Sequence, residues 1–273
     1  MIDLHLHTTA SDGLLAPAAL VARAAQVGLR TISVTDHDTF AGLAEAGEAA
    51  RQYRLRLVSG VEITAVEEGR DVHMLAYFID PSSHAFAGFL EAQRADRVRR
   101  VREIADRLAS LGLGIDTDRL LASTADRTGH SIGRPQIADA LIAAGHARDR
   151  DDAFDRLLGS GSPAFVPRCG PTPEAVISLV REAGGVVSMA HPGLTRMDHI
   201  IPRLAAAGLA SLEVRHSDHD GPTEQRYRDL AAGHALAVSG GSDFHGDVGH
   251  RATVLGRVTI SAGELSALEA RRP

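Results

Sequence analysis

Apolar residues in the first third of the chain follow two alternating patterns. Short apolar runs such as Ile2–Leu6 and Thr31–Val34 are typical of buried strands. The stretches between them have the spacing of amphipathic helices, with Pro17 and Gly28 where one helix would begin and end. This alternation predicts parallel strands with helices packed outside them. The predicted strands are 2–6, 31–34, 56–63 and 71–79, and the predicted helices are 17–27 and 41–53.

The pattern changes after residue 86. A long charged helix is predicted over 86–111, followed by short helical segments at 132–144 and 149–158, with no strand signal between them. A Gly/Ser loop at 159–163 ends this stretch. We therefore predict a helical insertion, or cap, over residues 95–166, and a main domain formed by residues 1–94 and 167–273.

The strand and helix alternation then resumes toward the C-terminus. About seven strands in all are enough for a barrel-like sheet, so the predicted fold class is an α/β barrel with a small α-helical insertion. The later predicted strands are 186–190, 210–215, 235–239 and one near 254–260, and the later predicted helices are 173–183, 198–207, 223–233 and a short last helix.

Composition narrows the class of protein. The 273 residues include 44% hydrophobic and 23% charged residues, ordinary values for a globular protein. A formal net charge of −6 argues against extended DNA binding, and the single cysteine, Cys169, excludes an intramolecular disulfide. No apolar run has the length of a membrane span, and the first residues lack the layout of a signal peptide. We expect a cytoplasmic monomer.

Histidine and carboxylate side chains recur where the predicted strands end. In a parallel barrel these ends open onto one face, so such side chains can meet despite wide separation in sequence. His5 and His7 alternate along a strand, so both point to the same side and can chelate one ion. The full set is His5, His7, Asp12, His37, Glu62, His73, His191, Asp243 and His245.

Each of these residues alone has an ordinary explanation. His73 could be a hydrogen-bonded core histidine, and Glu62 or Asp243 a helix cap or a surface charge. Nine of them at strand ends indicate a shared metal site, and imidazole with carboxylate suits Mn²⁺, Zn²⁺ or Fe²⁺ better than Ca²⁺ or Mg²⁺. The lack of thiolate ligands argues against structural zinc. Five other histidines, in helical or loop stretches, are predicted to be solvated: His84, His146, His199, His219 and His234.

Several motifs resemble those of the polymerase and histidinol phosphatase (PHP) family. They are Asp3-Leu4-His5-Leu6-His7-Thr8, Ser11-Asp12-Gly13, Thr35-Asp36-His37-Asp38, Gly60-Val61-Glu62, Ala190-His191-Pro192 and Gly241-Ser242-Asp243-Phe244-His245. The resemblance implies a distorted (β/α)₇ barrel and three divalent metal ions, with Mn²⁺ the first choice. It assigns His5, His7, Glu62 and Asp243 to the first ion, Asp12, His37 and His245 to the second, and Glu62, His73 and His191 to the third.

Arginines in the predicted cap suggest a phosphate site. Arg94, Arg97, Arg99, Arg100 and Arg102 lie in the long helix, and Arg134 precedes a proline at the start of another helix, where backbone amides favour anions. A solvated helix face explains Arg99, Arg100 and Arg102 equally well. We predict that Arg94, Arg97 and Arg134 bind a substrate phosphate.

The cap, Gly133-Arg134-Pro135 and the stretch from Glu213 to Ser217 resemble one branch of the family. Its members remove the 3′-phosphate of 3′,5′-nucleotide bisphosphates, and relatives digest short 5′-phosphorylated RNA. The resemblance gives His216 a phosphate contact or the protonation of the leaving oxygen, and Arg134 a role in orienting substrate. Three alternatives stay open: a short-RNA exonuclease, a histidinol-phosphate phosphatase, which the arginines disfavour, and a non-catalytic metal-binding partner module, which the complete ligand set disfavours.

Overall fold

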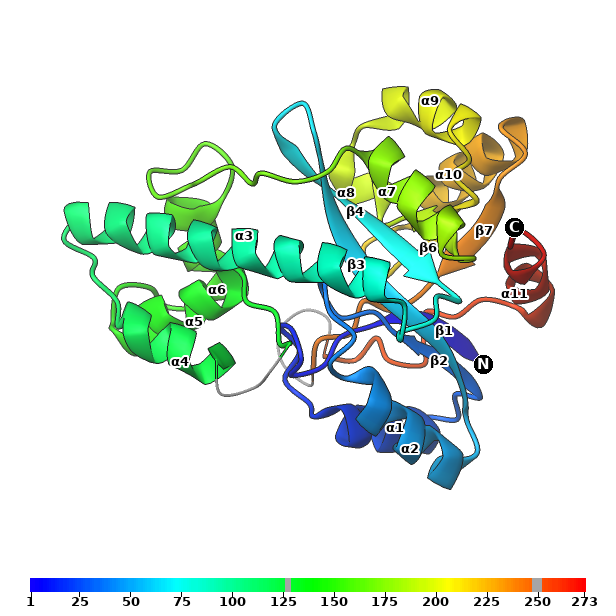
Figure 1. Ribbon diagram of the computed structural model, residues 1–273, viewed down its shortest axis with the longest axis horizontal. Coiled ribbons are helices and arrows are strands. Elements are labelled where there is room, and N and C mark those ends of the chain that lie inside the picture. Colours follow the sequence, from blue (N-terminus) through cyan, green and yellow to red (C-terminus); the bar gives the residue numbers. More distant parts are fainter. Residues whose placement is uncertain (126–128, 247–251) are drawn as a thin grey trace.

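The computed structural model describes residues 1–125, 129–246 and 252–273 (Figure 1). In these residues seven strands form one sheet in which neighbours in sequence are neighbours in space. After the last strand the chain pairs with the first, because Asp243 N–H donates to the His5 carbonyl at 2.9 Å and His7 N–H to the Phe244 carbonyl at 3.0 Å. The sheet therefore nearly closes, and the predicted α/β barrel is confirmed. The strands are β1 (Ile2–Leu6), β2 (Thr31–Val34), β3 (Arg56–Glu67), β4 (Arg70–Tyr77), β5 (Val186–Met189), β6 (Ser211–Arg215) and β7 (Ala237–Gly240).

Helices cover the outside of the barrel (Figure 1). Leu20 of α1 shares a core cluster with Ile32 of β2, and Val176 of α7 shares another with Val187 of β5. The amphipathic spacing thus places apolar side chains between the helices and the sheet. These helices are α1 (Pro17–Gln26), α2 (Leu43–Tyr53), α7 (Pro173–Glu182), α8 (Pro192–Thr195), the 3₁₀ turn η2 (Asp198–Ile200), α9 (Ile201–Ala206), α10 (Gly221–Gly233) and α11 (Ala262–Glu269).

Strand β4 corrects the prediction of parallel strands throughout. It runs antiparallel to both β3 and β5, whereas the other pairs within the sheet are parallel. Glu68 and Gly69 join β3 to β4 with φ of 51° and 72°, a two-residue hairpin connection. A parallel crossover needs a dozen or more residues, so this connection leaves only the antiparallel arrangement.

The cap projects from one end of the barrel (Figure 1). Its apolar residues form a core of their own, in which Ile104 and Leu108 meet Leu141 and Leu158. The predicted boundary at residue 95 falls inside one continuous helix, and the division into domains stays a prediction. The cap elements are α3 (His84–Ser110), α4 (Thr117–Ala125), α5 (Arg134–Ala143), α6 (Arg150–Ala153) and the π-helical turn η1 (Phe154–Leu158).

The predicted last strand near 254–260 is wrong. Residues 254–259 are turn and irregular backbone, and Ile260 makes one bridge to Ile2. Leu255 instead packs into the α1 and α2 core, and Ile260 into the core under α11. The apolar residues that suggested a strand therefore anchor an irregular segment to two cores.

No helix in the described parts of the chain is both long and apolar enough to cross a bilayer.

Candidate metal centre and basic pocket

His5, His7, Glu62 and Asp243 meet at the open end of the barrel. Nε2 of His5 and Nε2 of His7 lie 3.1 Å apart. Each of these nitrogens lies within 3.3 Å of Oε2 of Glu62 and of Oδ1 of Asp243. Two imidazole nitrogens and two carboxylate oxygens thus face one point, the arrangement predicted for the first ion.

Asp12, His37 and His245 form a second group beside the first. Oδ1 of Asp12 lies 3.3 Å from Nε2 of His245 and 3.6 Å from Nδ1 of His7, and Oδ2 lies 3.6 Å from Nε2 of His37. Together with His7 these ligand atoms lie within 4.8 Å of one another. His7 therefore lies between the two groups.

Glu62 connects the second group to a third. Oε1 of Glu62 lies 2.8 Å from Nδ1 of His73 and 3.2 Å from Nε2 of His191, while Oε2 lies 3.2 Å from Nδ1 of His37. His73 reaches this position because antiparallel β4 begins where β3 ends, opposite Thr64. The structure thus gathers all nine predicted ligand residues at one end of the barrel.

The chemistry of these groups fits divalent cations. Nδ1 of His7 and Nδ1 of His37 are buried without a hydrogen-bond partner, although each lies within 3.6 Å of a carboxylate oxygen. Burial acts to raise the pKa of the Glu62 carboxyl, but the surrounding imidazoles, His37 first, hold this pKa well below its usual range. The bridging carboxylate is therefore in the ionised form that a cation requires.

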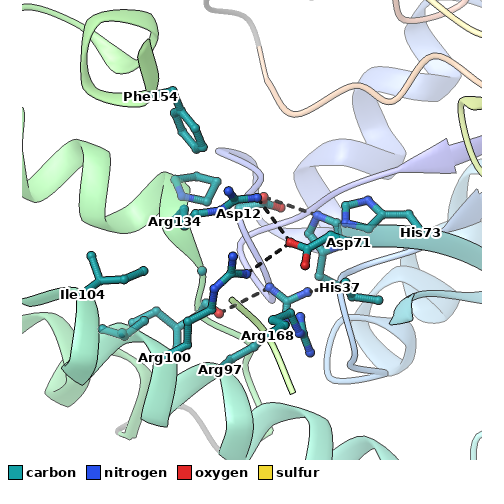
Figure 2. A pocket seen from close by; sticks show the side chains of 15 residues that line it. Asp12, His37, Asp71, His73, Arg97, Arg100, Ile104, Arg134, Phe154 and Arg168 are labelled. Atoms are coloured by element: carbon teal, nitrogen blue, oxygen red, sulfur yellow. Dashed lines mark hydrogen bonds and ion pairs between the residues drawn. The ribbon is translucent and has the colours of Figure 1, made fainter. Parts of the chain in front are cut away.

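A basic pocket lies beside the metal groups, between the barrel and the cap (Figure 2). Asp12, His37 and His73 line it on the barrel side, and Arg97, Arg100, Arg134 and Arg168 complete it. The carboxylates paired with these four guanidinium groups are Asp38, Asp71 and Asp96, the last of which lies 3.7 Å from Nε of Arg168. The basic pocket therefore carries an excess of positive charge next to the ligands.

Two of the pocket arginines are tied to the barrel through Asp38. Oδ2 of Asp38 accepts from Nε of Arg97 at 2.6 Å and from Nη2 of Arg168 at 3.1 Å. Burial acts to raise the pKa of Asp38, but these arginines lower it to about 2. Arg97 also donates to Thr64 and to the Ile132 carbonyl, so each of its guanidinium nitrogens has an acceptor.

Arg100 and Arg134 share Asp71. Oδ2 of Asp71 accepts from Arg100 Nη1 at 3.2 Å and from Arg134 Nη2 at 3.3 Å, while Arg100 Nη2 is buried without a partner. The Arg134 guanidinium lies 5.6 Å from the Phe154 ring and 5.8 Å from the Phe165 ring. Arg94 lies outside the pocket lining and donates to the Asp38 carbonyl at 3.0 Å.

Comparison with known proteins agrees with this geometry. Residues 3–131 match the PHP domain family model. The 5′-3′ exoribonuclease Rnm of Salmonella typhimurium is 35% identical over 89% of this chain and 84% of its own length. The chain belongs to the PHP family. A 3′,5′-nucleoside bisphosphate phosphatase of Chromobacterium violaceum is 32% identical over 91% of this chain and 90% of its own length.

A solved structure from Bifidobacterium adolescentis, assigned as a metal-dependent phosphoesterase, superposes with a TM-score of 0.89. It is 38% identical and covers 100% of this PHP chain, which covers 96% of that chain. The sequence-based assignment to the family and the hydrolase class is confirmed. The protein is a PHP phosphoesterase, an enzyme that hydrolyses phosphate esters.

Sequence reasoning missed one buried acid of the PHP site, Glu213. Its Oε1 accepts from Nδ1 of His5 at 2.8 Å and its Oε2 from the backbone N–H of His191 at 2.7 Å. The signal was an acid between Leu212 and Val214, both fully buried, in a strand whose alternate residues face the barrel interior.

His216 and His219 are also buried. The backbone N–H of Asp218 donates to His216 Nδ1 at 3.1 Å, so the ring proton lies on Nε2, 3.3 Å from Oδ2 of Asp243. Burial lowers the pKa of His216, which keeps the ring neutral. The prediction that His219 is solvated is wrong, because its ring bonds to the Val214 carbonyl and to Gly193 N–H.

Gly241 provides a test of how tightly the PHP ligands are packed. A Cβ at this position would lie 2.4 Å from both Cβ and N of His5. We expect Gly241→Ala to displace β1 and to lower bound Mn²⁺ and kcat/KM by at least about 10-fold, because ligand geometry tolerates little displacement. Gly88→Ala, at a helical site with nothing within 4 Å, is the control and should change neither quantity. Normal metal content in Gly241→Ala would contradict this packing argument.

Proposed function

We propose that this PHP enzyme removes the 3′-phosphate from 3′,5′-nucleotide bisphosphates. It uses three divalent cations, with Mn²⁺ the first choice and Zn²⁺ or Fe²⁺ as alternatives. The cations are held by the ligand groups predicted from the family resemblance. Bound there, they would supply a hydroxide near neutral pH and neutralise the phosphoryl oxygens.

The observation that carries the proposal is the basic pocket beside the ligand cluster. One phosphate of the substrate lies over Asp12, His37 and His73, and the second phosphate lies among the arginines. A substrate with two phosphates on one nucleoside satisfies both regions. The Chromobacterium relative bears the name of this activity.

Arg134 is the main contact for the 5′-phosphate. The two phenyl rings beside its guanidinium restrict its motion, so little conformational entropy is lost when it binds an anion. Arg100 assists through the buried Nη2 that has no acceptor. The other predicted phosphate contacts, Arg94 and Arg97, are engaged with Asp38, and we assign them the support of the pocket.

His216 has a proposed part as a hydrogen-bond donor. Its neutral ring donates Nε2–H to Asp243, and donation of the same N–H to the leaving ribose oxygen would stabilise the charge that develops there, while water supplies the proton. The contact with Asp243 also directs Oδ1 of that carboxylate toward His5 and His7.

Degradation of short 5′-phosphorylated RNA from its 5′ end is the second candidate function. The Salmonella relative is named a 5′-3′ exoribonuclease, and a terminal 5′-phosphate would fit the same arginines. Histidinol phosphate, a small cationic substrate, would meet repulsion from the basic pocket.

One assay separates these functions. The Mn²⁺-loaded enzyme is given adenosine 3′,5′-bisphosphate, a 5′-phosphorylated trinucleotide RNA and histidinol phosphate, and phosphate or nucleotide release is followed. We expect the highest kcat/KM with the bisphosphate. A higher value with the trinucleotide would favour the exonuclease, a higher value with histidinol phosphate would reject both, and no hydrolysis of any substrate would favour a binding module.

A further inference from the structure

Glu213 holds two ligand residues that come from different strands. His5 lies on β1 and His191 follows β5, and both meet the carboxylate of Glu213 on β6. The side chains of His5 and Glu213 are fully buried, so solvent does not compete for these contacts. We propose that Glu213 is a positioning residue that orients His5 and His191 toward the cations without binding one itself.

The carboxylate of Glu213 fixes the tautomer of the His5 ring. An ionised carboxylate can only accept hydrogen bonds, so Nδ1 of His5 must carry the proton. Nε2 then presents its lone pair toward His7, Glu62 and Asp243, the point where the first cation would lie. A carboxylate behind a ligand histidine fixes the tautomer and ring orientation in this way.

Glu213 also holds the backbone turn at His191. This residue has φ 25° and ψ 60°, a conformation that costs free energy in a residue other than glycine. The 2.7 Å bond from its N–H to Oε2 of Glu213 stabilises the turn. This conformation brings Nε2 of His191 to within 3.2 Å of Oε1 of Glu62.

The contacts of Glu213 favour positioning over direct metal binding. Glu213 forms a compact group with His5 and His216, and the group could in principle hold an ion of its own. Both oxygens of Glu213 already accept from N–H groups, and both ring nitrogens of His216 face Asp218 N–H and Asp243. The polar side-chain atoms of Glu213 and His216 are thus already engaged with His5, His191, Asp218 and Asp243.

The decisive variant is Glu213→Gln, which keeps the shape of the side chain. Glutamine offers one acceptor oxygen and one NH₂, so it can satisfy His5 or His191 but not both. If the NH₂ faces His5, the ring proton moves to Nε2 and the ligand is lost. If the NH₂ faces His191, two N–H groups oppose each other at the strained turn.

The test is Mn²⁺ binding by titration calorimetry, with metal content after dialysis measured by elemental analysis. We expect Glu213→Gln to weaken Mn²⁺ binding by about 10–100-fold. The weakened sites should be those of His5 and His191, so the variant should retain fewer ions than wild type. Glu182→Gln, whose exposed carboxylate accepts from Ser178, is the matched control and should bind as wild type does. If Glu213→Gln had the same Mn²⁺ affinity and the same metal content as wild type, the proposal would be overturned.

A second measurement does not depend on the variant folding. In the Zn²⁺-loaded wild-type enzyme, long-range ¹H–¹⁵N NMR correlations report which ring nitrogen of His5 carries the proton. We expect a protonated Nδ1 and a metal-bound Nε2. Metal on Nδ1 of His5 would overturn the proposal, because Glu213 would then be a neighbour of the cation or its ligand.

Discussion

Replacing Asp12 or His37 by alanine is expected to lower kcat/KM by about 10³-fold on the preferred phosphoester. Both residues belong to the second group of predicted ligands and also line the basic pocket, so each substitution would remove a predicted ligand next to the proposed phosphate site. The measurement is steady-state hydrolysis at saturating Mn²⁺, with folding checked by circular dichroism.

His84→Ala is the control for this experiment, since His84 is exposed at the start of α3. It should hydrolyse substrate at the wild-type rate. If Asp12→Ala or His37→Ala also retained the wild-type rate, hydrolysis would have to take place elsewhere in the molecule.

Replacing Arg134 by glutamine is expected to lower kcat/KM for adenosine 3′,5′-bisphosphate by about 10²-fold, as the loss of a charged hydrogen-bond donor would do. The same variant should hydrolyse adenosine 3′-monophosphate nearly as wild type does, because that substrate has no 5′-phosphate. The comparison of the two substrates isolates the arginine contact from the chemistry at the metal ligands.

Arg99→Gln is the matched control, because Arg99 pairs with Asp96 and Glu103 on the same helix, away from the pocket lining. Arg99→Gln should hydrolyse both substrates with the wild-type kcat/KM. If Arg134→Gln lowered kcat/KM equally for both substrates, Arg134 would support the cap and would not bind the 5′-phosphate.

That the nine predicted ligand residues come together could be foreseen because their signals are local. His5 and His7 alternate on a strand, and His37, His191 and Asp243 directly follow strands whose ends meet at one edge of the sheet. The direction of β4 was missed because the apolar pattern of a strand is the same in both directions. The short connection through Glu68 and Gly69 was the available signal.

The supporting residues of the site are harder to predict from sequence. Glu213 and Asp71 are single acids in strands, and their roles depend on partners far away in sequence, such as His5 and Arg134. Arg168 lies in the loop before α7, and its partner Asp38 is 130 residues away in the sequence. Such pairings are set by the closure of the barrel and the docking of the cap, which periodicity does not encode.

The antiparallel course of β4 has a consequence for the evolution of the pocket. The chain leaves β4 at the end of the barrel away from the ligands, so α3, which is 27 residues or about 40 Å long, runs back toward them before its second half enters the cap. Arg97 and Arg100 lie on this helix one turn apart, and each added residue before them would rotate them by about 100°. The rotational phase of a single helix therefore fixes where these two charges lie, and insertions before Arg97 should be tolerated only in steps close to whole turns.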